Sequence, residues 1–596
     1  MQELQSIQDI FNQRIFKIPD YQRGYSWTRK QLKEFWEDVN NLPSHRFHYT
    51  GMLSLKQVDL LTYKNWNDEL WLVQERSYKA FHIVDGQQRL TTIIIFIQVI
   101  FELLKDLPEA QGKQDEEIYI GSFSLKALCE RYLFITKPPD FLITSYKFGY
   151  EVDNPSFQYL RHRIFNEPNG GSIEETLYTL NLNNAKNFFK ENLDLHYKEF
   201  GFSGVELLFK KVTQNLMFNL YEINDDFDVF VAFETMNNRG KKLSNLELLK
   251  NRLIYLNTLF AESELASDER ITLREDINKA WKEVYKQLGR NKHKKLDDDE
   301  FLMAHWIIYY KYSREKGNDY INFLLEEQFT PQKVFSKTEI KTNSLEHVEE
   351  LHDEAEPEEG EENGVEDPVV SSSKLKPKEI QDYVNSLKTA SVHWYNTFNP
   401  LNNHDLTEDE KLWIDRLNRI GMVYFRPLVT ASFMNNSVTS EDRVHLFKEI
   451  ERFIFIIFRM GRAYSTYRNS EFYRAARELN RGDTSINDII STLNERMSWS
   501  FNTNENGNTY IDHGYFQKYL QKKFNNGGGF YKWNGLRYFL YEYEMNKVRQ
   551  RGSQKIDWQL FVNSPKDKIS IEHIYPQTPV STRPTPSLLP GAYRVA

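Results

Sequence analysis

The segment FHIVDGQQRLTT, Phe81 to Thr92, decides the fold of the N-terminal half of the chain. The short apolar run from Phe81 to Asp85 predicts a strand, and an apolar helical pattern from Leu90 to Leu104 begins almost at once. Gly86 permits a tight turn with a close backbone approach between the two. The segment therefore predicts a strand that turns directly into a helix.

This turn has the chemistry of an anion site. The N-terminus of a helix offers unpaired N–H groups, and the guanidinium of Arg89 fits phosphate oxygens. Asp85, at the end of the strand, is suited to hold a metal ion or to position a water molecule. The alternative is that Asp85 and Arg89 simply pair with each other.

Further short apolar or β-branched runs predict more strands around this segment. Helical spacing of apolar residues predicts helices at Phe227 to Met236 and Leu243 to Leu256. This part of the chain therefore reads as α+β. The additional predicted strands are Arg14 to Ile18, Tyr49 to Leu55, Leu70 to Val73 and Leu216 to Glu222.

An acidic stretch separates this part from the rest. Residues 346–367 hold twelve acidic residues and no Lys or Arg, so the net charge of −9 becomes +3 without them. Such a stretch repels itself and buries little apolar area, which predicts a disordered linker; the alternative is an acidic DNA mimic or docking tail. Nucleic-acid binding by the folded parts stays open.

After the linker the pattern becomes mainly helical. A chain of 596 residues is too long for one core. We predict an α+β domain at 1–255, a helical extension at 256–345, an acidic linker at 346–376, a helical domain at 377–525 and a final segment at 526–596. The helices predicted here are Pro377 to Thr397, Glu408 to Ile420, Val444 to Met460, Ser470 to Leu479, Ile486 to Met497 and Leu536 to Lys547.

Two further motifs carry polar and aromatic side chains. In IPDYQRGYSW, Ile18 to Trp27, aromatic side chains suit stacking on a base and their polar neighbours suit phosphate contacts; the alternative is that the aromatics anchor the loop on the core. In FETMNNRGKKLSNLELLKNRL, Phe233 to Leu253, Gly240 is a natural C-cap and Ser244 a natural N-cap, so helix punctuation alone explains most of the pattern. Its lysines are then ordinary surface charges.

The order and spacing of IPDYQRGYSW, DGQQRLTT and NNRGKKLSNLELLK resemble one family. They are similar to the N-terminal domain of GmrSD-type, modification-dependent (type IV) restriction endonucleases and their phage-defence relatives, which has a ParB/sulfiredoxin-like fold. The resemblance covers residues 1–255 and continues through Leu296 to Trp306.

The resemblance implies nucleotide binding and hydrolysis, with GTP, UTP and ATP all open as the nucleotide. The chain has no GxxxxGK[ST] segment, so the phosphate cradle differs from a P-loop. The implied catalytic residues of this domain are Asp85 and Gln88. The implied nucleotide-binding residues are Gln22, Arg23, Gly86, Gln87, Arg89, Asn237, Asn238 and Arg239.

Near the end of the chain, ISIEHIYPQTP, Ile569 to Pro579, resembles the opening of an HNH nuclease domain. The resemblance implies that His573 is the general base of a Mg²⁺-dependent ββα-metal site, with Glu572 as a weaker candidate metal ligand. The nineteen residues after Gln577 contain no His, Asn, Asp or Glu. We therefore expect the nuclease segment to be truncated and its site not to close on this chain alone.

Candidate DNA contacts come from two places. The stretch Phe458 to Arg481 mixes arginines with tyrosines and suits a face that follows the phosphate backbone, although an ordinary helix surface is the alternative. The candidate DNA-contact residues are Tyr21, Tyr25, Trp27, Arg462 and Arg468.

The sequence has no signal peptide and no run of eighteen apolar residues, and its one cysteine, Cys129, forms no internal disulfide. We expect a cytoplasmic protein without membrane contact. Its expected partners are double-stranded, modified DNA and a nucleoside triphosphate, with a second copy or a partner subunit left open. The predicted function is nucleotide-dependent restriction of foreign DNA; the alternatives are a nucleotide-gated DNA-binding regulator without nuclease activity and an interaction scaffold without hydrolysis.

Overall fold

The fold was analysed in a computed structural model of the chain. The residues that the structure describes are 4–19, 22–59, 63–152, 154, 156–168, 170–171, 173, 175–223, 244–291, 296–312, 320–341, 369–461, 463, 465–505, 508–525, 533, 535–551 and 558. They fall into two compact units. Unit 1 comprises Met1–Asn399, Arg426–Asn436 and Ser470–Arg481, and unit 2 comprises Pro400–Phe425, Ser437–Asn469 and Gly482–Ala596.

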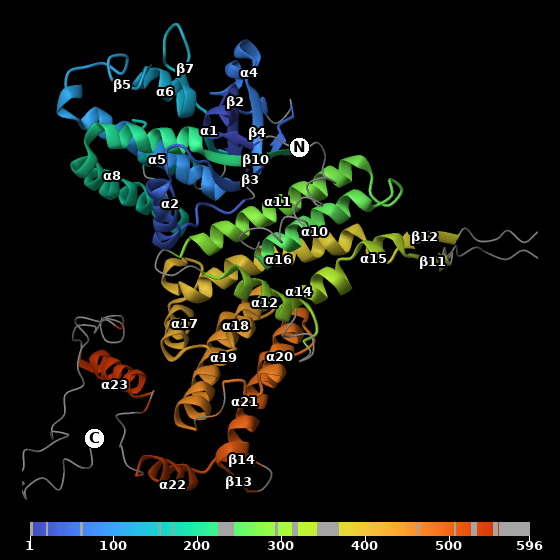
Figure 1. The fold of residues 1–596 in the computed structure, drawn as a ribbon. Helices are drawn as coiled ribbons and strands as arrows, with labels where there is room; N and C mark the ends of the chain where they lie inside the picture. The colour runs from blue at the N-terminus through green and yellow to red at the C-terminus, as the bar shows by residue number, and fades with distance from the viewer. Residues whose placement is uncertain are drawn as a thin grey trace, which may run out of the picture. The chain divides into compact units, whose positions relative to one another are not determined.

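A mixed six-stranded sheet, in the order β1-β10-β3-β4-β2-β9, forms the centre of the N-terminal part of unit 1 (Figure 1). Strand β10 is parallel to β3, and β2 is parallel to both β4 and β9, whereas β1 is antiparallel to β10 and β3 is antiparallel to β4. The strands are β1 (Leu4–Ser6), β2 (Arg14–Ile18), β3 (His48–Gln57), β4 (Lys79–Asp85), β9 (Phe148–Tyr150) and β10 (Leu216–Ile223).

Helix α5 (Gln87–Asp106) is the core helix of this part. Its apolar residues, from Leu90 to Leu104, are buried almost all round, and it packs on α8 (Leu177–Lys210), which is kinked at Gly201. Helix α2 (Arg29–Asn41) also packs on α8. By length and hydropathy α5 is also the one helix of the described residues that qualifies as a membrane span, but most of it is buried inside the protein. An all-round apolar helix of this kind is typical of a protein core.

Shorter elements complete the N-terminal part. Two small hairpins, β5 with β6 and β7 with β8, lie outside the main sheet. The bounds are α1 (Ile7–Ile10), α4 (Leu70–Arg76), β5 (Tyr119–Ile120), β6 (Phe123–Ser124), α6 (Leu125–Tyr132), β7 (Phe134–Thr136), β8 (Thr144–Tyr146) and α7 (Ser156–Tyr159).

The other described residues of unit 1 form helices and one hairpin, β11 with β12. Helix α11 packs along α16. Its elements are α10 (Asn245–Leu259), α11 (Ser267–Gly289), α12 (Asp298–Tyr309), α14 (Tyr320–Asn322), α15 (Pro331–Phe335), β11 (Lys337–Lys341), β12 (Val369–Ser373), α16 (Pro377–Phe398), α18 (Arg426–Met434) and α20 (Asn469–Arg481).

Unit 2 is built around α19, which packs on α17 and α21. Its last described helix, α23, is linked to α17 by ion pairs, in which Glu542 of α23 pairs with Arg416 and Arg419 of α17. The elements are α17 (Glu408–Ile420), α19 (Ser440–Phe453), α21 (Ile486–Phe501), β13 (Asn502–Glu505), β14 (Asn508–Ile511), α22 (His513–Phe524) and α23 (Leu536–Arg551).

The predicted α+β class is confirmed, and most predicted elements are present within a few residues. The strand predicted at Leu70 to Val73 is wrong, because these residues begin helix α4, which buries Trp71 and Leu72 and ends at the left-handed Ser77. Short apolar runs do not distinguish a strand from a buried helical turn. The predicted helix at Phe227 to Met236 and the acidic stretch at 346–367 lie outside the described residues.

Candidate functional site

The turn between β4 and α5 places Asp85 at the end of a strand and directly before a helix N-terminus. Gly86 is the N-cap of α5 and has φ +90°, a conformation that side chains disfavour, and no side chain caps the helix. A Cβ on Gly86 would also lie 2.9 Å from Cδ1 of Leu53. Glycine therefore lets β4 turn into α5 against β3, and an uncapped helix start of this kind suits an anion.

Arg89 turns its guanidinium toward strand β3. Nη1 donates to the carbonyl oxygen of Thr50 at 3.0 Å, and Nη2 donates to that of Met52 at 2.6 Å and lies 3.5 Å from Oδ2 of Asp85. The register of β3 against β10 shifts at this point, and Gly51 has φ +121°. Arg89 thus satisfies carbonyl groups of an irregular strand, while its side chain keeps 27% of its surface exposed.

The loop after β2 is tied to this turn by two glutamines. Gln88 accepts from the Ser26 amide at 2.7 Å and donates to the Gly24 carbonyl at 3.2 Å. Nε2 of Gln22 donates to two carbonyls near the end of β4, those of Ile83 at 2.9 Å and Val84 at 3.0 Å. These bonds hold the loop that carries Arg23 beside Asp85.

Three buried polar atoms around the turn have no hydrogen-bond partner among the described residues: Oε1 of Gln22, Oε1 of Gln87 and Nε of Arg23. Unsatisfied buried polar atoms are uncommon and costly, so a cluster of them beside a carboxylate calls for an explanation. Two acceptors and one cationic donor suit a ligand that brings both a cation and an anion.

Asp85 lies in an unusual electrostatic setting. Burial raises the pKa of its carboxyl above the ordinary value, Arg89 and the Gly86 amide lower it in part, and Glu247 raises it further. The charge of Arg23 lowers the pKa of Asp85 in part. Nε of Arg23 lies 3.3 Å from Oε1 of Glu247. A carboxyl with a raised pKa at a strand end is a recognised feature of functional sites.

Residues 7–254 match the family model of the GmrSD restriction endonuclease N-terminal domain. The match supports the GmrSD restriction endonuclease family, indicates a function related to restriction and implies DNA as a partner. No curated protein matches the chain. The GmrSD-like segment contains the whole Asp85 site, from Gln22 to Glu247.

The aromatic residues of the GmrSD-like loop differ in their surroundings. Tyr25 is fully buried, and its hydroxyl lies 2.7 Å from Oγ1 of Thr92. It therefore anchors the loop on the core, as the alternative interpretation has it, and this burial is incompatible with the predicted DNA contact. Trp27 is partly buried, 6.4 Å from the ring of Phe35.

Arg468, another predicted DNA contact, is exposed in unit 2 and has φ +57°. The remaining predicted site residues lie outside the described part of the chain: Tyr21, Asn237, Asn238, Arg239, Arg462, Glu572 and His573. Glu247 was missed at the sequence level, although Ser244-Asn245-Leu246-Glu247 carries the S-x-x-E pattern of a capping box. Gly51 was also missed, and no local pattern marks it.

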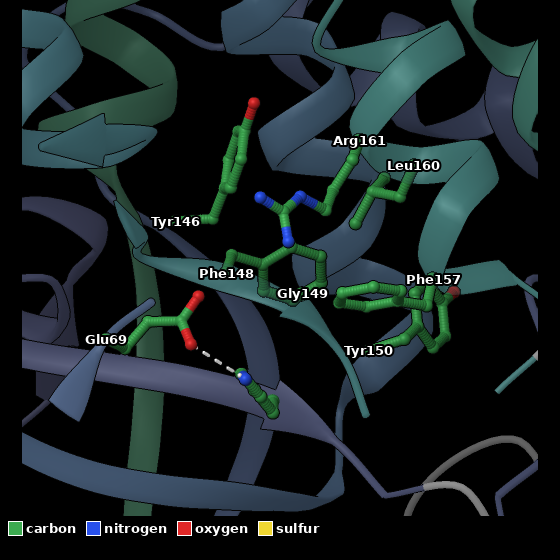
Figure 2. A pocket seen from close by; sticks show the side chains of 9 residues that line it. Glu69, Tyr146, Phe148, Gly149, Tyr150, Phe157, Leu160 and Arg161 are labelled. Atoms are coloured by element: carbon green, nitrogen blue, oxygen red, sulfur yellow. Dashed lines mark hydrogen bonds and ion pairs between the residues drawn. The ribbon is translucent and has the colours of Figure 1, made fainter. Parts of the chain in front are cut away.

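A second feature of the GmrSD-like segment is a small cavity beside β2 and β9 (Figure 2). Its volume is about 10 Å³, room for about one water molecule. Its charged groups are paired: Lys17 lies 2.9 Å from Glu69, and Arg161 contacts Asp68 and Glu167. This is a satisfied buried network with a structural role. Within the described residues, no cluster of three His, Cys, Asp or Glu side chains has the arrangement of a metal site.

Proposed function

We propose that the chain is a nucleotide-dependent DNA restriction protein whose Asp85 site binds and hydrolyses a nucleoside triphosphate. The observation that carries this proposal is the start of α5, which has no side-chain cap, beside a half-buried carboxylate and three polar atoms that have no hydrogen-bond partner among the described residues. The GmrSD-like match supplies the link to restriction.

Phosphate groups fit the positive side of this site. The uncapped amide groups of α5 point out of the helix N-terminus, where the helix dipole favours negative charge. Nε of Arg23 is a buried donor that lies 3.3 Å from Oε1 of Glu247 but has no hydrogen-bond partner among the described residues. Arg89 stays a proposed phosphate contact: its hydrogen bonds to β3 stabilise the turn, and 27% of its side-chain surface remains exposed.

Mg²⁺ fits the negative side. Asp85 and the unpartnered amide oxygens of Gln22 and Gln87 are hard oxygen donors of the type that Mg²⁺ takes. Bound there with the nucleotide, the ion would neutralise phosphate charge. A carboxylate oxygen of Asp85 that does not bind the ion is also suited to accept a proton from an attacking water. Gln88 keeps the loop of Arg23 in place, which supports hydrolysis by positioning.

We further propose that the N-terminal domain is ParB/sulfiredoxin-like, that hydrolysis controls the action on modified double-stranded DNA, and that His573 and Glu572 belong to an HNH nuclease segment. The mixed sheet with its core helix α5 supports an α+β domain of that general kind. The nuclease assignment depends on the ISIEHIYPQTP motif alone.

The test is phosphate release from ATP, GTP, UTP and CTP with Mg²⁺, with and without modified DNA. We expect hydrolysis of at least one nucleotide by the full chain and a loss of roughly 100-fold or more in Asp85→Ala, as for other catalytic proton acceptors. Asp140→Ala is the matched control, because Asp140 is an exposed carboxylate of the same unit. Equal turnover in wild type and Asp85→Ala would remove the proposal.

A further inference from the structure

Arg23 is a buried cation that pairs with Glu247 without a hydrogen bond from its Nε. Its side chain is 12% exposed, and its Nε lies 3.3 Å from Oε1 of Glu247 but has no hydrogen-bond partner among the described residues. Burial lowers the pKa of Arg23, but Glu247, Tyr285 and Asp298 raise it above the usual value. The guanidinium is therefore charged, and its Nε lacks a hydrogen-bond acceptor among the described residues, which is a costly state for a buried group.

Glu247 serves Arg23 and helix α10 at the same time. Oε1 faces Arg23, while Oε2 accepts from the backbone amide of Ser244 at 2.9 Å and from its hydroxyl at 3.2 Å. Oγ of Ser244 in turn accepts from the Glu247 amide at 3.3 Å, which completes a capping box. The carboxylate that faces Arg23 is thus part of the first turn of α10.

The start of α10 is connected to three other helices. The Asn245 amide donates to Oδ1 of Asp299 in α12 at 3.0 Å, and Nδ2 of Asn245 donates to the hydroxyl of Tyr320 in α14 at 3.0 Å. Nε1 of Trp281 in α11 donates to the Leu246 carbonyl at 3.0 Å. A change in the first turn of α10 therefore reaches the helical part of unit 1.

We propose that the Arg23–Glu247 ion pair is a nucleotide-sensitive latch between the Asp85 site and helix α10, with Glu247 as a positioning residue. The inference rests on the proposed function, because the ligand that opens the latch is the nucleotide. Phosphate oxygens offer the hydrogen-bond acceptor that Nε of Arg23 lacks among the described residues. When Arg23 turns to them, Glu247 loses its cation, and the first turn of α10 with its contacts to α11, α12 and α14 responds.

Three variants of the full chain separate the charge of Glu247 from its capping role. Glu247→Gln removes the charge but keeps an oxygen for the capping box, because Gln is also favoured at this position. Glu247→Ala removes both. Glu269→Gln is the matched control: Glu269 holds the same N3 position in α11, where it accepts from the Ala266 amide at 3.2 Å and is exposed.

The readouts are KM and kcat for the nucleotide and amide hydrogen exchange in residues 244–259, with and without Mg²⁺ and the nucleotide. We expect Glu247→Gln to lower KM several-fold with little change in kcat, because Arg23 is no longer held by a carboxylate. In wild type and Glu269→Gln, nucleotide should increase exchange at the start of α10, and in Glu247→Gln this response should disappear. Glu247→Ala should lower KM as well and, unlike Glu247→Gln, lower the thermal stability.

Each failure is informative. Absence of nucleotide binding to wild type would overturn the proposed function together with the latch. Binding that leaves exchange in α10 unchanged, or a KM that is unchanged or higher in Glu247→Gln, would overturn the latch alone.

Discussion

A Cβ atom on Gly51 would lie 1.7 Å from Nη1 of Arg89. The two residues are 38 positions apart in sequence, yet the close approach of Arg89 to β3 requires that Gly51 carry no side chain. The irregular strand and the arginine of the β4–α5 turn therefore form one structural unit.

Replacing Gly51 with Ala tests this unit. Both the positive φ and the contact with Arg89 oppose a side chain, so we expect Gly51→Ala to lower the free energy of unfolding by more than the roughly 1 kcal/mol of backbone strain alone. Gly112→Ala is the control, because Gly112 also has a positive φ but has nothing within 4 Å of an added Cβ. Thermal unfolding compares the two, and equal losses would show that Arg89 yields freely.

Arg89→Ala should affect both stability and turnover. The carbonyls of Thr50 and Met52 lose their donors, which costs about 1–3 kcal/mol when such groups stay buried, and Asp85 loses its nearest cation. We therefore expect a lower midpoint in thermal unfolding and lower nucleotide turnover below that midpoint. Unchanged hydrolysis in the folded variant would exclude any role of Arg89 at the site.

Tyr25→Phe distinguishes anchoring of the loop from DNA contact. The hydroxyl of Tyr25 is buried and bonds to Thr92, so its removal should cost about 1 kcal/mol of stability and leave DNA affinity unchanged. Fluorescence anisotropy with labelled duplex DNA measures the affinity. A clear loss of affinity at unchanged stability would contradict the anchoring role.

Lys147 makes the stability of the N-terminal part depend on pH. Burial, together with nearby Arg131, lowers the pKa of Lys147 from 10.5 to about 7, and its Nζ donates to the Phe11 carbonyl at 2.5 Å. Between these pKa values the unfolded chain binds the proton and the folded chain does not, so stability rises with pH across this window and the full penalty remains below it.

Lys147→Met should remove this dependence. We expect the variant to be more stable than wild type near pH 7, and the difference to shrink as the pH rises toward 10. Urea unfolding at several pH values measures it. A difference that is constant with pH would mean that Lys147 stays charged in the folded protein.

The local pattern around Asp85 was sufficient to predict its place in the fold. An apolar strand, a glycine and a long apolar helix follow one another from Phe81 to Leu104, and each signal is contained in a few neighbouring residues. The same kind of signal wrongly predicted a strand at Leu70 to Val73, because a run of four apolar residues fits a buried helical turn equally well.

The partners of the site residues could not be predicted in this way. Arg23 meets Glu247, and Arg89 meets Thr50 and Met52, only because the sheet order brings distant segments together. The sequence pattern around Arg89 therefore predicted a phosphate contact, whereas in the fold its guanidinium donates hydrogen bonds to carbonyls of β3. The sequence left open whether Tyr25 stacks on a base or anchors the loop on the core, because burial is a property of the folded chain.

The most direct test of the Asp85 site is equilibrium binding of a radiolabelled nucleoside triphosphate, with Mg²⁺, to the full-length wild type, Arg23→Ala and Asp140→Ala. We predict that wild type and Asp140→Ala each bind one nucleotide per chain. Folded Arg23→Ala should bind the nucleotide at least roughly ten-fold more weakly than wild type, which is the loss expected for a charged hydrogen bond to phosphate. Equal affinity in all three proteins, or no binding to wild type, would contradict the account.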